Sequence, residues 1–193
     1  MLKLGVLGST KGTDLEAIIT AIQNKSLNAK VNLVVSNKEN AFILDRAKMY
    51  NIKNEFLSDH LVSREKYGKL LTDIFLLNDV NIILLIGFMK ILSRSFCLDW
   101  KNKILNVHPS LLPKYAGGMN NNVHDEVIKN GDKETGCTIH FVTAEVDAGP
   151  ILIQKKCKVS SGDTIQSLKQ KVQLLEGQAF IEALHKIENE NYA

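Results

Sequence analysis

The most constraining feature of this sequence is a nearly continuous apolar run, VNIILLIG, at residues 80–87. A strand with one face in water alternates apolar and polar side chains, whereas a strand covered on both faces is apolar throughout. The run therefore predicts a strand that is buried on both faces of its sheet.

Strand-like and helix-like patterns alternate on either side of this run. Short β-rich runs occur at 2–8, 30–37, 51–57 and 103–108, and apolar residues at helical spacing occur at 14–24, 41–50, 63–78, 93–99 and 121–129. This alternation is typical of βαβ units and predicts an α/β fold with a doubly wound, mostly parallel sheet. The β runs at 135–142 and 150–159 predict a C-terminal antiparallel extension. A long terminal helix is predicted over about 163–189, with SSGDT as its cap and one apolar stripe, namely Ile165, Leu168, Val172, Leu175 and Ala179.

Length and composition exclude several classes of protein. A chain of 193 residues with 45% hydrophobic content predicts a single domain, 1–193. A net charge of +3 without charge blocks gives no reason to expect nucleic acid or membrane as a partner. The three cysteines form no C-x-x-C pair, which favours reduced thiols and no structural metal. The start lacks a signal-peptide pattern, so we expect a cytoplasmic protein.

Three polar segments are predicted to meet at one cleft. In a doubly wound sheet the ligand crevice lies beyond the carboxyl ends of the strands, where the strand order reverses. If the strands at 2–8 and 80–87 are neighbours there, GSTKGTD (8–14), GFMKIL (87–92) and NVHPS (106–110) open into the same space. The first segment enters a helix and could hold a phosphate on backbone N–H groups, but it matches neither G-x-G-x-x-G nor the P-loop. A glycine turn capped by Thr13 or Asp14 explains it equally well, and GFMKIL fits plain core packing as well as a wall for a flat ligand.

The segment ILNVHPSLLP carries the strongest chemical signal. Asn106 and His108 lie two apart on an extended segment and so share a face, where an amide N–H and an imidazole N–H could stabilise a developing oxyanion. Pro109 and Pro113 stiffen the chain that follows. Asp147, in EVDAGP, would favour the protonated ring if it faced His108. The alternatives are a packed histidine in a proline-braced turn and an aspartate with a turn or cap role.

The remaining histidines carry weaker signals. We expect His140 to be a hydrogen-bonded strand histidine and His124 to support the site from behind the contacting residues. His60 and His185 have the pattern of solvated surface residues.

Taken together, NVHPSLLPKY and DAGP closely resemble the N-H-P-S-L-L-P and D-x-G motifs of the folate-dependent formyltransferases. With GTDLEAI, SNK, SREKY, GFMKIL and VQLLEG, the resemblance covers nearly the whole chain and is strongest to the phosphoribosylglycinamide formyltransferase family of purine biosynthesis. It implies a Rossmann-like formyltransferase fold, and transfer of the formyl group of 10-formyltetrahydrofolate to the amine of glycinamide ribonucleotide. It implies small-molecule substrates, no metal, and a monomer or homodimer.

The resemblance also implies roles for individual residues. The catalytic residues would be His108 as the acid, Asn106 as the holder of the formyl oxygen, and Asp147 as the carboxylate that raises the basicity of His108. The ribonucleotide would contact Gly12, Thr13, Asp14, Gln173, Leu174, Leu175 and Glu176. The folate would contact Arg64, Met89, Lys90, Ile91, Leu92, Asn106, Thr143, Ala144, Glu145, Val146 and Asp147.

Three positions depart from the family pattern. Asp14 stands where Asn is usual, so we expect its side chain to turn away from the phosphate and Lys11 or backbone N–H groups to bind the anion. Lys90 stands where Arg is common, which removes bidentate contacts. The stretch AGGMNNNVHDEV is longer than its equivalent, which leaves the register of His124 open.

Other members of the wider family remain as alternatives. Methionyl-tRNA formyltransferase shares the SLLP segment but has a further domain, and formyltetrahydrofolate hydrolase has a preceding regulatory module; we expect neither addition here. A folate- or nucleotide-binding protein without activity is a different class, and the presence of Asn106, His108 and Asp147 argues against it.

Overall fold

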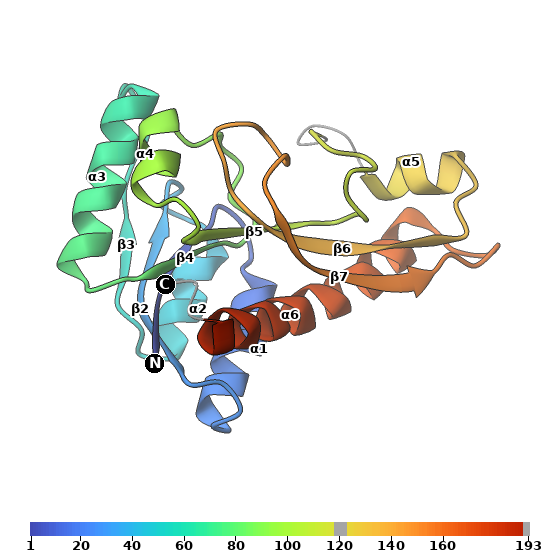
Figure 1. The fold of residues 1–193 in the computed structure, drawn as a ribbon, viewed down its shortest axis with the longest axis horizontal. Coiled ribbons are helices and arrows are strands. Elements are labelled where there is room, and N and C mark those ends of the chain that lie inside the picture. The colour runs from blue at the N-terminus through green and yellow to red at the C-terminus, as the bar shows by residue number, and fades with distance from the viewer. Residues whose placement is uncertain (118–122, 191–193) are drawn as a thin grey trace.

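The computed structural model describes residues 1–117 and 123–190, and these contain one sheet of seven strands in the order β3-β2-β1-β4-β5-β6-β7 (Figure 1). The strands are β1 (Leu2–Leu7), β2 (Ala29–Ser36), β3 (Asn54–Phe56), β4 (Ile82–Leu85), β5 (Ile104–His108), β6 (Glu134–Phe141) and β7 (Ile151–Lys158). The helices are α1 (Thr13–Gln23), α2 (Phe42–Met49), α3 (Arg64–Leu77), α4 (Arg94–Asp99), α5 (Val123–Lys129) and α6 (Ile165–Glu190).

The pairing of the strands confirms the doubly wound prediction. Strands β3, β2, β1, β4 and β5 are parallel, whereas β6 pairs antiparallel with β5 and with β7. The strand order runs from β1 to β2 and β3 in one direction and from β1 to β4 and β5 in the other. The reversal therefore lies between β1 and β4, where the sequence predicted a crevice.

The apolar run of β4 is explained by helices on both faces of the sheet. Ile82 and Leu84 pack into a core with buried residues of α1, α2 and α6, and Ile83 and Leu85 pack into a second core with residues of α3 and α4. Figure 1 shows these two groups of helices on opposite sides of the sheet. All four side chains are at most 6% exposed. Successive strand residues point to opposite faces, so both faces need apolar side chains.

Helix α6 is the long terminal helix that the sequence predicted, and it crosses beneath β6 and β7 (Figure 1). Its start is capped by Thr164 and Ser167, whose side-chain oxygens each accept a hydrogen bond from the other's backbone N–H, at 3.1 and 3.0 Å. Leu168, Val172 and Ala179 of the predicted stripe are fully buried, whereas Ile165 is exposed.

The predicted strand at 51–57 is shorter than expected, because only Asn54–Phe56 pairs with β2 at the sheet edge. The first two residues of the predicted helix at 121–129 lie outside the described residues, as does most of the 116–122 loop. All three cysteines are free thiols. Among the helices in the described part of the chain, none has the length and hydropathy to cross a membrane.

Candidate active site

A cavity of about 570 Å³ opens at the carboxyl ends of β1, β4 and β5. Four segments and one face of α6 form its walls. The segments are Thr10 to Asp14 without Lys11, Leu85 to Leu92, Asn106 to Pro109, and Val142 to Asp147. The three segments that the sequence predicted to meet do meet here. The topology accounts for this, because parallel strands end at the same edge of a sheet.

The segment after β4 is held against the end of β1 by polar contacts. The Met89 backbone N–H donates to Ser9 Oγ at 3.2 Å, and the Ser9 hydroxyl donates to Asn37 Oδ1 at 2.7 Å. Gly87 turns the chain with φ of 60°, and a Cβ there would lie 2.2 Å from Thr10 Oγ1. The turn leaves Met89, at 46% exposed, on the cavity wall.

Lys90 also lines the cavity, where it forms an ion pair with Asp59 at 2.8 Å. The carboxylate of Asp59 therefore partly neutralises the positive charge of Lys90 at this wall.

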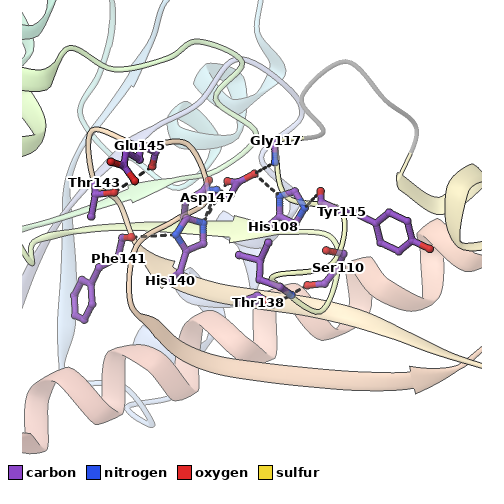
Figure 2. A network of polar contacts seen from close by, with 12 residues as sticks. His108, Ser110, Tyr115, Gly117, Thr138, His140, Phe141, Thr143, Glu145 and Asp147 are labelled. Atoms are coloured by element: carbon purple, nitrogen blue, oxygen red, sulfur yellow. Dashed lines mark hydrogen bonds and ion pairs between the residues drawn. The ribbon is translucent and has the colours of Figure 1, made fainter. Parts of the chain in front are cut away.

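His108, at the end of β5, is buried and fully hydrogen bonded. Its Nδ1 lies 3.2 Å from Asp147 Oδ2, and its Nε2 lies 2.9 Å from the Tyr115 carbonyl oxygen (Figure 2). A carboxylate and a carbonyl are both acceptors, so the imidazolium, with two N–H donors, satisfies both contacts at once. Both ring nitrogens of His108 therefore face acceptors.

The chain that follows His108 is braced by one strand residue. The Thr138 hydroxyl donates to the Ser110 carbonyl at 2.7 Å and accepts from the Leu112 N–H at 3.0 Å. Thr138 pairs with His108 across β5 and β6, so these two hydrogen bonds lie directly beside His108. They fix the segment that presents the Tyr115 carbonyl.

Asp147 reaches His108 from a strained turn. Its φ is 52°, in the left-handed region that residues other than glycine rarely adopt. Oδ2 also accepts the Gly117 N–H at 2.9 Å. Burial acts to raise the pKa of Asp147, but the hydrogen bonds from His108 and Gly117 and the charges of His108 and His140 hold it below its ordinary value. The carboxylate is therefore ionised at neutral pH.

His140 belongs to the site, although its sequence pattern indicated only a strand histidine. Asn106 faces it across β5 and β6, and Asn106 Nδ2 lies 3.2 Å from His140 Nε2. The ring's Nδ1 lies 3.0 Å from the Phe141 carbonyl, which assigns the proton to Nδ1 and leaves Nε2 to accept from the amide. Burial lowers the pKa of His140, despite the Phe141 carbonyl and Asp147, and so favours the neutral ring. His140 thus orients Asn106 and leaves one amide N–H for a ligand.

The other end of the cavity is formed by α1 and α6. Gly12 is the N-cap of α1 with φ of 66°, and Gln173 Nε2 donates to Thr13 Oγ1 at 2.6 Å. Asp14 is 6% exposed, and its carboxyl group accepts no hydrogen bond within the described residues. Burial raises its pKa to about 7, and burial followed by the charge of Asp14 raises the pKa of Glu176 to about 8. The Asp14 side chain is therefore buried, and Asp14 and Glu176 both line the cavity.

Most of the predicted site residues line the cavity, but Arg64, Leu174 and Leu175 do not. Of the four residues predicted on α6, Gln173 and Glu176 face the cavity, whereas Leu174 is 74% exposed and Leu175 packs against the core. Helical periodicity explains the division, since four consecutive residues point in four directions.

His124 is buried and lines the cavity as well. Its Nδ1 has no hydrogen-bond partner among the described residues, and burial followed by the charge of Lys169 lowers its pKa. In the described ranges no group of three or more His, Cys, Asp or Glu residues is arranged to hold a metal ion.

This fold and this site define a member of the formyl transferase family: the chain belongs to it, and residues 2–184 match the family described as "Formyl transferase". The phosphoribosylglycinamide formyltransferase of Escherichia coli (strain K12) is 39% identical over 172 residues, which are 89% of this chain and 80% of that protein.

A longer relative and a solved structure agree with this assignment. The trifunctional purine biosynthetic protein adenosine-3 of Gallus gallus is 40% identical over 187 residues, but the chain spans 18% of that longer protein. The crystal structure of glycinamide ribonucleotide transformylase 1 from Symbiobacterium toebii superposes with a TM-score of 0.90 at 32% identity, over 95% of this chain and 86% of that one.

Proposed function

We propose that this chain transfers the formyl group of 10-formyltetrahydrofolate to the amine of glycinamide ribonucleotide in de novo purine biosynthesis, giving formylglycinamide ribonucleotide and tetrahydrofolate. The observation that carries the proposal is the convergence of Asn106, His108 and Asp147 at one cavity. The family membership and the similarity to the E. coli enzyme support it. The proposal treats residues 1–193 as one catalytic domain that acts on small molecules in the cytoplasm, without a metal, as a monomer or homodimer.

The two ends of the cavity would take the two substrates. The apolar wall at Met89 to Leu92 and the loop from Thr143 to Asp147 suit a flat pterin with polar edges. The start of α1, with Gln173 and Glu176, suits the phosphate and the ribose hydroxyls. The formyl carbon and the attacking amine would then meet between Asn106 and His108.

The reaction needs no covalent enzyme intermediate. The amine attacks the formyl carbon, and negative charge develops on the formyl oxygen. The free amide N–H of Asn106 and the Nε2–H of His108 donate hydrogen bonds to that oxygen. For this the hydrogen bond from His108 Nε2–H to the Tyr115 carbonyl must break. The ionised Asp147 holds the imidazolium in place. Water relays the surplus proton of the amine to the folate nitrogen as the bond between that nitrogen and the formyl carbon breaks. Loss of one such donor raises the barrier by on the order of 3 kcal/mol, or about a hundredfold in rate.

The test is turnover of purified protein with both substrates. We expect formation of formylglycinamide ribonucleotide and deformylated folate in equal amounts, identified by mass spectrometry. Equal consumption of the folate without the ribonucleotide would show that water is the acceptor, as in a hydrolase. Formylation of methionyl-tRNA in place of the ribonucleotide would assign the chain to the other branch of the family.

A further inference from the structure

The charge of the cavity poses a problem for the substrate proposed above. At the end formed by α1 and α6 two carboxyl groups line it, those of Asp14 and Glu176, and with pKa values raised to about 7 and about 8 they are ionised in part near neutral pH. The phosphate of a ribonucleotide is also anionic, so it needs a compensating cation at its end of the cavity. Among the described residues two lysines line the cavity, Lys90 and Lys169.

Of these two, Lys169 is the cation that remains available. Lys90 is paired with Asp59 at 2.8 Å, whereas Lys169 has no ion pair within the described chain. Lys11, which the sequence offered as an anion ligand, is exposed and does not line the cavity. An unpaired ammonium at a cavity wall can bind an anion without first breaking an internal contact.

The position of Lys169 on α6 directs it to the start of α1. It lies four residues before Gln173 and seven before Glu176, and this spacing places all three on one face of the helix. Gln173 bridges that face to Thr13. The charge of Lys169 lowers the pKa of His124 and acts to lower that of Glu176, so its field reaches this end of the cavity. The fully buried Leu168, packed against Val123 and Val127 of α5, fixes this turn of the helix.

Asp14 is the reason that a phosphate at the start of α1 needs the positive charge of Lys169. Its carboxyl lies in the first turn of α1, where unpaired backbone N–H groups would bind a phosphate, and it is buried at the cavity without a hydrogen bond from the described residues. An amide at this position would donate to an anion, whereas Asp14 repels an anion to the extent that it is ionised, which is about half at pH 7. A cation across the gap on α6 offsets that repulsion.

We propose that Lys169 binds the phosphate of the ribonucleotide and is a specificity-determining residue for phosphorylated over unphosphorylated acceptor. The inference rests on the proposed function and deepens it. It predicts that the Lys169 side chain contributes to the binding of glycinamide ribonucleotide and contributes nothing to the binding of the corresponding ribonucleoside or of the folate.

The experiment compares Lys169→Gln with wild type on both acceptors. For the ribonucleotide we expect KM to rise about tenfold with kcat within threefold, since an exposed charge-assisted contact is lost. For the unphosphorylated glycinamide ribonucleoside, kcat/KM should be equal in the two proteins. Lys169→Arg should restore most of the ribonucleotide KM, and Lys186→Gln, which removes the same charge from α6 away from the cavity, should behave as wild type.

Two results would overturn the inference. One is an unchanged ribonucleotide KM in Lys169→Gln, and the other is an equal loss with the phosphate-free acceptor. Neither outcome bears on the proposed function, which fails only if wild-type protein does not formylate the ribonucleotide.

Discussion

Replacement of Asp14 by Asn should stabilise the protein, by an amount that grows with pH. Burial raises the pKa of this carboxyl from 3.8 to about 7. Because each pKa unit corresponds to about 1.4 kcal/mol, a folded chain with ionised Asp14 carries a penalty of about 4 kcal/mol. The helix N-terminus favours a carboxylate by up to about 1 kcal/mol, so about 3 kcal/mol remains for Asn to relieve.

The direction of the pH dependence follows from the two protonation states. Below pH 4 the carboxyl is protonated in both folded and unfolded chains, and the substitution has little effect. Between pH 4 and 7 the unfolded chain is ionised while the folded chain is not, so the stability of wild type falls with rising pH. Above pH 7 the penalty is constant. The gain from Asp14→Asn should therefore increase by about 2 to 3 kcal/mol between pH 5 and pH 8.

Urea denaturation of both proteins at pH 5 and pH 8 measures this difference directly. Asp99→Asn is the control, because it makes the same change at an exposed carboxylate at the end of α4. A gain for Asp14→Asn that is the same at both pH values would refute the reasoning, as would a loss of stability at pH 8. The first result would mean that the pKa of Asp14 is the same in the folded and unfolded chains, and the second that the folded chain stabilises the ionised carboxylate.

Three further substitutions test the site and the core. In His140→Phe the Asn106 amide loses its acceptor, and kcat should fall about tenfold with KM within threefold in steady-state assays; a larger change in KM than in kcat would contradict a positioning role. In Gly149→Ala the new Cβ would lie 1.7 Å from the Phe141 carbonyl oxygen, so the backbone at the ends of the loop from Thr143 to Asp147 must move. Both kcat and the melting temperature should therefore fall. Phe180→Ala, at a fully buried position, should lower the free energy of unfolding by about 3 to 5 kcal/mol, measured by urea titration, and an effect below 1 kcal/mol would contradict the packing described here.

The fold was predictable because its signals are local and strong. The run at 80–87 is apolar on both faces since two separate cores need it, and the alternation of strand and helix patterns fixed the parallel topology. The strand at 51–57 was overestimated because an edge strand with a single neighbour ends where its pairing ends.

The site was predictable only in part, because several of its contacts depend on register and rotation. Cross-strand register, which sequence does not specify, places His140 opposite Asn106. On α6, the 3.6-residue period could have removed Leu174 and Leu175 from the candidates and added Lys169. The ion pair between Lys90 and Asp59 depends on a loop that carries no periodic pattern.

The role of His108 in formyl transfer is tested most directly by the single-turnover rate of His108→Ala with both substrates saturating. We expect a rate at least about a hundredfold below wild type in a protein with unchanged circular dichroism, since the donor to the formyl oxygen is lost while both binding ends remain. A rate within threefold of wild type would show that the imidazole paired with Asp147 does not carry the reaction.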